Sequence, residues 1–138
     1  MYIFLFVKIL YFSCFRYIDG TGTKHSFPSN SCCEQPNYVR YVEHVVVKIS
    51  VQYSRRGDMV IILTSPMGTN STLLPKRSKD FSNAGFSGWE FMSTHYWGEN
   101  PFGYWHLYVL NAGKTSNRGK LIVLFGHDFF ILNVKLTF

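Results

Sequence analysis

The side chains that could carry out nucleophilic chemistry in this sequence stand without the partners such chemistry needs. A serine hydroxyl requires a nearby base and a site that stabilises the developing oxyanion. The segment Gly85-Phe86-Ser87-Gly88 is one residue short of the Gly-x-Ser-x-Gly turn that exposes a nucleophilic serine. No strand pattern leads into this segment, so we interpret it as part of a loop. The sequence therefore predicts no catalytic residue.

The histidines and carboxylates also lack the spacing of a metal site. The five histidines form no His-x-x-x-His pair, and no Cys-x-x-Cys accompanies them: His25, His44, His95, His106 and His127. The acidic side chains do not follow the Asp-x-Asp-x-Asp/Asn-Gly pattern that organises a calcium loop. We predict that this chain has no metal or cofactor site.

The net charge of +6 at pH 7 does not by itself indicate a nucleic-acid partner. Nucleic-acid surfaces gather Lys and Arg on one face with aromatic side chains between them. Here the basic residues are spread through expected turns and strand exteriors, apart from the clusters Arg55-Arg56 and Lys76-Arg77-Ser78-Lys79. We interpret the charge as that of solvated loops and predict no nucleic-acid binding.

The elements that would position these side chains are predicted to be short strands. Apolar residues alternate with more polar ones over residues 44–53, which is typical of a strand with one buried face. Further strands are expected over residues 59–64, 71–74, 89–92 and 104–110. Because the chain is 18% aromatic and no helical period is sustained, we predict one all-β domain, an antiparallel β-sandwich of jelly-roll type.

The segments between the expected strands are rich in turn residues. Residues 54–58 are predicted as a hairpin turn, in which Gly57 adopts a positive φ and Arg56-Gly57-Asp58 is exposed at the tip. A second turn is expected over residues 65–70, followed by a long polar loop over residues 76–88. The Gly, Thr, Ser, Asn and Pro content of residues 20–35 predicts a linker without helix or strand.

Several short sequence motifs, in the order in which they occur, resemble those of one known family. They are Glu43-His44-Val45, Ser54-Arg55-Arg56-Gly57-Asp58, Leu63-Thr64-Ser65-Pro66-Met67-Gly68-Thr69, Trp89-Glu90-Phe91-Met92-Ser93-Thr94-His95, Tyr96-Trp97-Gly98-Glu99-Asn100-Pro101 and Gly103-Tyr104-Trp105-His106-Leu107. This run is similar to the P domain, or Homo B domain, of kexin/furin-like proprotein convertases. The resemblance covers residues 32–121. We predict that residues 1–31 and 122–138 are atypical segments outside the domain.

The resemblance implies a non-catalytic domain of a subtilisin-like serine endopeptidase. In that family a separate catalytic domain cleaves after paired basic residues in the secretory pathway, with Golgi, membrane or extracellular locations, and the P domain stabilises and regulates it. The catalytic motifs of that family, Asp-Ser/Thr-Gly, His-Gly-Thr and Gly-Thr-Ser, are absent from this sequence. The chain is therefore expected to be a fragment without peptidase activity, whose partner is the catalytic domain of the same protease. Calcium is implied for the intact enzyme only.

The resemblance also implies roles for individual residues. Four aromatic side chains are expected to pack in the core or against the catalytic domain: Trp89, Phe91, Trp97 and Trp105. Cys32 occupies a position that forms a disulfide in the family, and Cys14 is a substitute for the missing partner. Asn70-Ser71-Thr72 is an N-glycosylation acceptor if the chain enters the secretory pathway.

Three alternatives stay open at the level of sequence. The apolar run 1–18 contains Lys8 and Arg16 and fits neither a signal peptide nor a spanning helix well, so we favour an artefact of the gene model over a signal anchor and leave membrane association open. Either residues 121–125 form a shortened closing strand or the last strand of the family is missing. Finally, the chain is alternatively a free-standing secreted binding module that uses the Arg56-Gly57-Asp58 turn.

Overall fold

The structure is a computed structural model that describes residues 4–6, 14–29, 41–123 and 131–133. The described residues contain ten strands and one short helical turn, η1 (Arg56–Asp58). The strands are β1 (Phe4–Phe6), β2 (Cys14–Ile18), β3 (Gly22–Ser29), β4 (His44–Tyr53), β5 (Met59–Thr64), β6 (Asn70–Leu74), β7 (Phe86–Ser93), β8 (Gly103–Asn111), β9 (Gly119–Val123) and β10 (Ile131–Asn133). Among these residues, no helix is long and apolar enough to cross a bilayer.

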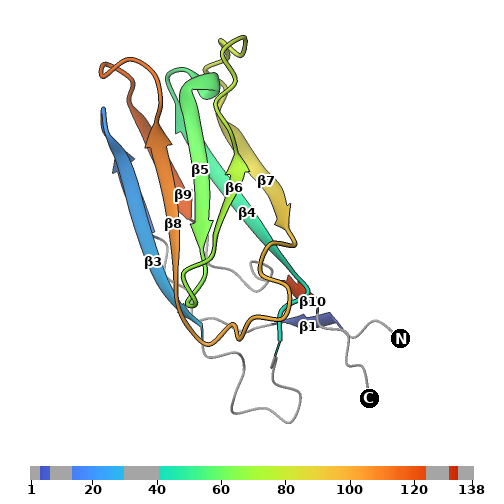
Figure 1. The fold of residues 1–138 in the computed structure, drawn as a ribbon. Coiled ribbons are helices and arrows are strands. Elements are labelled where there is room, and N and C mark those ends of the chain that lie inside the picture. The colour runs from blue at the N-terminus through green and yellow to red at the C-terminus, as the bar shows by residue number, and fades with distance from the viewer. Residues whose placement is uncertain (1–3, 7–13, 30–40, 124–130, 134–138) are drawn as a thin grey trace.

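Two antiparallel sheets form the body of the molecule (Figure 1). One sheet has the order β3-β8-β5-β6. In the other sheet β4 lies between β7 and β9, β9 also pairs with β2, and the short strands β10 and β1 extend from the start of β4. Strands β2 to β9 therefore form two four-stranded sheets, β2-β9-β4-β7 and β3-β8-β5-β6. This is the eight-stranded jelly-roll arrangement, so the predicted β-sandwich is confirmed.

The core lies between the sheets and is built by alternation within the strands. Every second residue of β4 is buried, as the sequence pattern predicts, and so are alternate residues of β5 and β8. Trp105 of β8 is 1% exposed, and its ring meets the ring of Tyr96 edge-on at 5.1 Å. The Tyr96 hydroxyl donates to the backbone oxygen of Leu63 at 2.6 Å, and burial raises the pKa of Tyr96 to about 12. The phenol thus stays neutral and joins β5 to the loop before β8.

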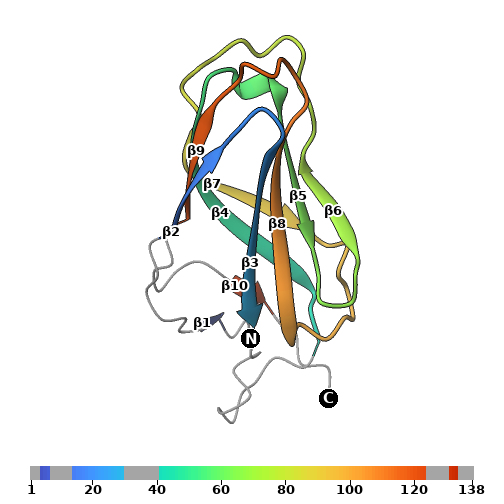
Figure 2. The same ribbon diagram turned by 90° about the vertical axis from the view of Figure 1, so that its left-hand side faces the viewer.

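The predicted linker over residues 20–35 is wrong for Gly22–Ser29, because this segment forms β3. It pairs with β8 over eight residues, and Cys14–Ile18 pairs with β9 as β2 (Figure 2). Only two side chains of β3, His25 and Phe27, are buried, so its alternation is too short and too polar to stand out in the sequence. The expectation that residues 1–31 stand outside the domain is therefore wrong for these two strands.

The closing strand is present. Gly119–Val123 forms β9, which pairs with β4 through residues 119–122 and with β2 along its whole length. Leu121 on this strand is fully buried. The alternative in which β4 loses its neighbour is therefore wrong, whereas residues 124–125 of the predicted strand lie outside the described residues.

Candidate functional site

The connection from β4 to β5 crosses from one sheet to the other, so it is not the predicted hairpin turn. β4 pairs with β7 and β9, whereas β5 pairs with β6 and β8. The turn η1 bridges the two sheets at the upper end of the molecule in Figure 1. Gly57 is buried, and the side chain of Asp58 is only 1% exposed. The predicted exposure of Arg56-Gly57-Asp58 is therefore wrong, and a receptor that needs the Asp58 carboxylate cannot reach it.

Gly57 is required by a close approach of two backbones and not by a positive φ, which corrects the sequence-based reason. A Cβ atom at this position would lie 2.1 Å from the backbone oxygen of Arg77 and 2.3 Å from that of Asp80. The Gly57 N–H donates to Asp80 O at 3.1 Å, and the Arg77 N–H donates to Gly57 O at 2.7 Å. The loop of residues 75–85 is thereby fixed against η1.

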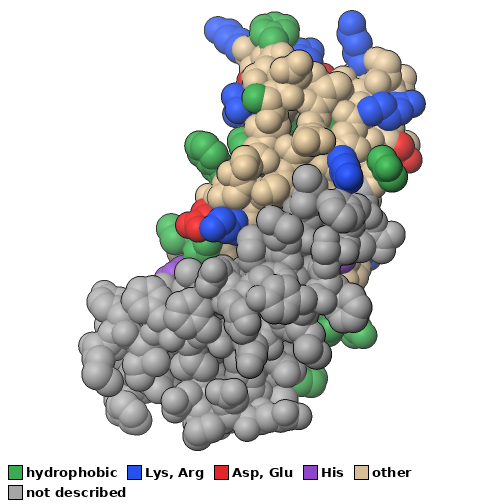
Figure 3. Space-filling model, turned by 180° about the vertical axis from the view of Figure 1, so that it is seen from behind, with side chains coloured by type: hydrophobic (Ala, Val, Ile, Leu, Met, Phe, Trp, Pro, Cys, Tyr) green, Lys and Arg blue, Asp and Glu red, His purple; other side chains and the backbone are tan. Residues whose placement is uncertain are grey.

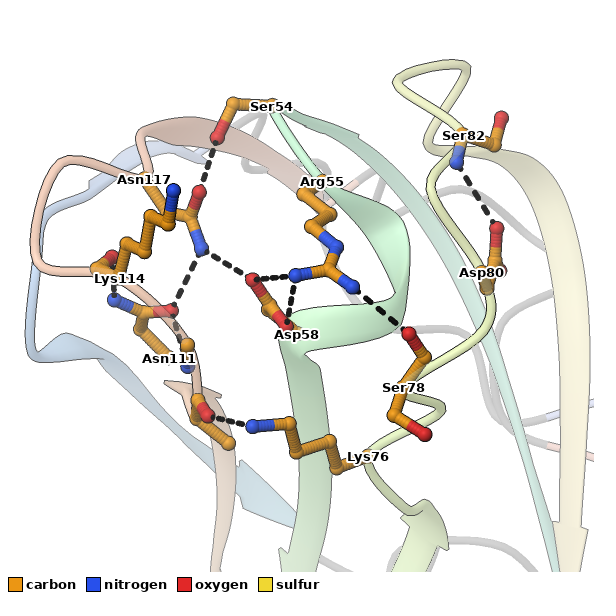
Figure 4. Close-up of polar contacts among 12 residues, drawn as sticks. Ser54, Arg55, Asp58, Lys76, Ser78, Asp80, Ser82, Asn111, Lys114 and Asn117 are labelled. Atoms are coloured by element: carbon orange, nitrogen blue, oxygen red, sulfur yellow. Dashed lines mark hydrogen bonds and ion pairs between the residues drawn. The ribbon is translucent and has the colours of Figure 1, made fainter.

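Asp58 is the centre of a polar network at this end (Figure 4). The Asn117 side-chain amide donates to Asp58 Oδ2 at 2.9 Å, and the Arg55 guanidinium lies 3.5 Å from the same carboxylate. The backbone oxygen of Asp58 accepts from the Ala112 N–H at 2.7 Å. Arg55 in turn donates to Ser78 O at 2.8 Å. Asp58 and Arg55 thus connect η1 to the loops of residues 112–118 and 75–85.

A second carboxylate, Asp80, holds two arginines. Arg56 Nε lies 2.8 Å and Arg77 Nη1 3.0 Å from Asp80 Oδ2. Both guanidinium groups lie over the ring of Phe86, at 5.3 and 5.6 Å from its centroid. The hydrogen bond from Arg56 is the main cause that lowers the pKa of Asp80 below its usual value of 3.8. The carboxylate is therefore charged at neutral pH and neutralises part of the surrounding positive charge.

Replacing Asp80 with asparagine is expected to remove a pH-dependent contribution to stability. A carboxyl group whose pKa is lowered by folding stabilises the native state above its unfolded pKa, and this contribution is lost as the pH falls through the folded value. The difference in melting temperature between the wild type and Asp80→Asn should therefore be constant above about pH 5 and should shrink below about pH 4. Thermal unfolding followed by circular dichroism at several pH values measures it. A difference that stayed constant down to pH 3 would contradict the assignment.

The described side chains do not assemble a catalytic site. Ser87 is exposed on β7, so the predicted loop is wrong for residues 86–88, which begin this strand. One serine, Ser26, does lie within hydrogen-bond distance of a histidine, with its Oγ 2.7 Å from His106 Nδ1 across β3 and β8. Local patterns in the sequence could not predict this contact, because the two residues are 80 positions apart. In the described part of the chain no carboxylate bonds to this pair. Nor do three His, Cys, Asp or Glu side chains come together there as metal ligands.

The four aromatic residues singled out in the sequence are placed in two different environments. Trp105 and Phe91 are buried in the core. Trp89 and Trp97 are 56% and 67% exposed, so they are free to contact another domain. Asn70 begins β6 with an exposed side chain that accepts from Thr64 Oγ1. Glycosylation of Asn70 and the disulfide of Cys32 stay predictions, since Cys32 and Cys33 lie outside the described residues and for Cys14 only the backbone is described.

Exposed apolar side chains gather at the end of the sandwich opposite η1. They belong to segments that lie at the lower end in Figure 1: the residues before β4, the β5–β6 turn, the β7–β8 loop and the start of β8. We call this surface the apolar end, and its residues are Tyr41, Met67, Trp97, Phe102 and Tyr104. Each of them is more than half exposed. Large exposed apolar patches mark surfaces that contact a partner.

Comparison with known proteins identifies the family of this chain. Residues 42–123 match the model of the family described as "Proprotein convertase P-domain". The chain belongs to this family. The P domain is 45% identical to furin of Mus musculus over 100 residues, which is 70% of this chain and 13% of furin. It is 51% identical over 92 residues to proprotein convertase subtilisin/kexin type 4 of Rattus norvegicus, 65% of this chain and 14% of that relative.

A solved structure supports the same fold. The crystal structure of the serine protease of Aeromonas sobria superimposes on 83% of this chain, and on 26% of its own, with a TM-score of 0.57 and 18% identity. The P domain described here thus spans only a small part of the length of the relatives that it matches.

Proposed function

We propose that this P domain packs against, stabilises and regulates the subtilisin-like catalytic domain of a furin-like serine endopeptidase that processes proproteins at basic sites in the secretory pathway. The observation that carries the proposal is the apolar end. Its five exposed side chains are large, and aromatic side chains and methionine are enriched where protein surfaces meet. The peptide-bond chemistry belongs to the catalytic domain, and so does the calcium dependence of the intact enzyme.

The apolar end is built as a rigid platform. Val42 donates to Glu99 O at 2.9 Å and accepts from the Gly98 N–H at 2.7 Å, which joins the start of β4 to the β7–β8 loop. The Thr69 hydroxyl donates to the Glu99 carboxylate, which joins the β5–β6 turn to the same loop. Because these segments are fixed to one another, little conformational entropy is lost when a partner covers them.

The proposal is tested with mouse furin from which the matched P-domain segment has been removed, so that its catalytic domain remains. The full chain is added to this truncated furin. We expect the chain to slow thermal inactivation of the catalytic domain several-fold, measured as residual cleavage of a dibasic peptide. The double variant Trp97→Ser/Phe102→Ser should lose this effect, because it removes two side chains of the apolar end.

The matched control is Tyr17→Ser/Phe81→Ser, which also removes two exposed aromatic side chains but leaves the apolar end intact. This control should stabilise the catalytic domain as the wild type does. Absence of any stabilisation by the wild-type chain, or equal loss in both double variants, would contradict the proposal.

A further inference from the structure

Positive charge gathers at the end of the sandwich opposite the apolar end. Four segments meet there, residues 19–21, 54–58, 75–85 and 112–118, as Figures 1 and 2 show. We call this surface the basic end. It carries four more positive than negative side chains, out of a net charge of +6 for the whole sequence. The seven positive residues are Arg55, Arg56, Lys76, Arg77, Lys79, Lys114 and Arg118, and the three negative residues are Asp19, Asp58 and Asp80. Figure 3 shows blue Lys and Arg side chains concentrated over this end.

The three acids of the basic end are already engaged. Asp80 is held by two arginines, and Asp58 is buried beside Arg55 and Asn117. Asp19 accepts hydrogen bonds from the Thr21 hydroxyl and from the N–H groups of Thr21 and Gly22, which lower its pKa to about 2. In the described part of the chain four exposed cations of this end form no ion pair: Lys76, Lys79, Lys114 and Arg118. Of these, Arg118 still acts on Asp19 through its charge, which helps to lower the pKa of that carboxyl group.

These cations come from two loops that contact each other (Figure 4). Lys76 Nζ donates to Ala112 O at 2.5 Å, which joins the 75–85 loop to the 112–118 loop. Asn111 donates to Lys114 O at 2.8 Å, and Arg118 donates to Thr115 O at 2.5 Å, so the second loop is closed upon itself. The positive charges thus lie on a fixed surface at one end of the domain.

We infer that the basic end binds a sulfated polysaccharide. Such a chain carries closely spaced anionic groups along a flexible backbone, so it can contact several cations on the two loops at once. Attraction between a cluster of like charges and a polyanion also raises the association rate. The cations without carboxylate partners are mostly lysines, whose flexible ammonium groups suit point contacts with sulfate groups.

Two other polyanions fit this surface less well. Single-stranded nucleic acids are bound through free aromatic faces between the cations. Within the four segments the only aromatic residue is Phe81. Its ring is exposed, and the Arg55 guanidinium lies over it at 4.4 Å from the centroid. A membrane surface calls for a broad apolar face beside the charges, and a single phenylalanine does not provide one.

The inference is tested on the full chain, without a catalytic domain, so its outcome is independent of the proposed packing function. Heparin is the probe, with binding measured by biolayer interferometry and by the salt concentration that elutes the protein from a heparin column. The double variant Lys79→Gln/Lys114→Gln should bind heparin about tenfold more weakly, because two charge contacts are lost. The dependence of affinity on salt should become shallower as well.

The matched control is Lys24→Gln/Lys48→Gln, which removes the same charge from β3 and β4 outside the basic end. It should bind heparin within about twofold of the wild type. Melting temperatures show whether each variant is folded. If Lys79→Gln/Lys114→Gln is not folded, the single variant Lys79→Glu replaces it in the binding measurement. Absence of heparin binding, equal weakening in both double variants, or binding to duplex DNA or phosphatidylserine vesicles as tight as to heparin would overturn the inference.

Discussion

Replacing Asp58 with alanine is expected to lower the free energy of unfolding by about 3 kcal/mol. The substitution removes a buried carboxylate and leaves the Asn117 amide and the Arg55 guanidinium without their shared acceptor. Unpaired buried donors cost about 1–3 kcal/mol each, and a charged partner costs more. The Arg55 side chain is 30% exposed, so water compensates part of its loss. Equilibrium unfolding in urea at pH 7 measures the change.

The control for this prediction is Glu90→Ala, which removes a carboxylate that pairs with Lys48 on the outer face of the sheet. That pair spans 3.7 Å, and the Glu90 side chain is 59% exposed. Exposed pairs contribute about 0–1 kcal/mol, so this variant should unfold at nearly the wild-type urea concentration. An Asp58→Ala variant as stable as Glu90→Ala would show that the network does not hold the sheets together.

The sequence was sufficient to predict the central strands because their apolar residues alternate strongly. β4, β5 and β8 supply most of the core. β4 and β5 begin at the predicted residue, and β8 begins one residue earlier than predicted. The edge strand β3 was missed because only two of its side chains reach the core, and local composition alone made it a linker. Its place depends on pairing with β8, which is more than 70 residues further along the chain.

The crossing at η1 shows a second limit of local patterns. Arg-Gly-Asp between two apolar strands is typical of an exposed hairpin turn, and nothing in the neighbouring residues indicates that the strands belong to different sheets. The burial of Asp58 follows from Asn117, which is 59 residues away. Likewise, the closeness of the 75–85 and 112–118 loops depends on the whole sandwich, so the basic end was visible in the sequence only as two small charge clusters.

The two proposed surfaces lie at opposite ends of one rigid sandwich, which has a consequence for how they work together. A catalytic domain on the apolar end would leave the basic end free, so both partners are able to bind at once. The core between the ends must then stay intact for either surface to keep its shape.

Replacing Trp105 with alanine tests that requirement and is expected to cost about 4 kcal/mol of folding free energy. The indole is fully buried, contacts the Tyr96 ring at 5.1 Å, and donates from Nε1 to Pro101 O at 3.0 Å. The substitution leaves a cavity beneath the β7–β8 loop and an unpaired carbonyl. Because of this cost, thermal unfolding should begin at a markedly lower temperature. The same loop contributes Trp97 and Phe102 to the apolar end, so the shape of that surface depends on the intact core.

The matched variant is Trp97→Ala, which removes the same side chain from a position that is 67% exposed. It should change the free energy of unfolding by no more than about 0.5 kcal/mol, because little apolar surface is returned to water and no core cavity forms. The comparison separates the two roles that the tryptophans have in this domain. If Trp97→Ala destabilised the isolated chain as much as Trp105→Ala, the side chain of Trp97 would belong to the core, and the apolar end would lose its largest contact residue.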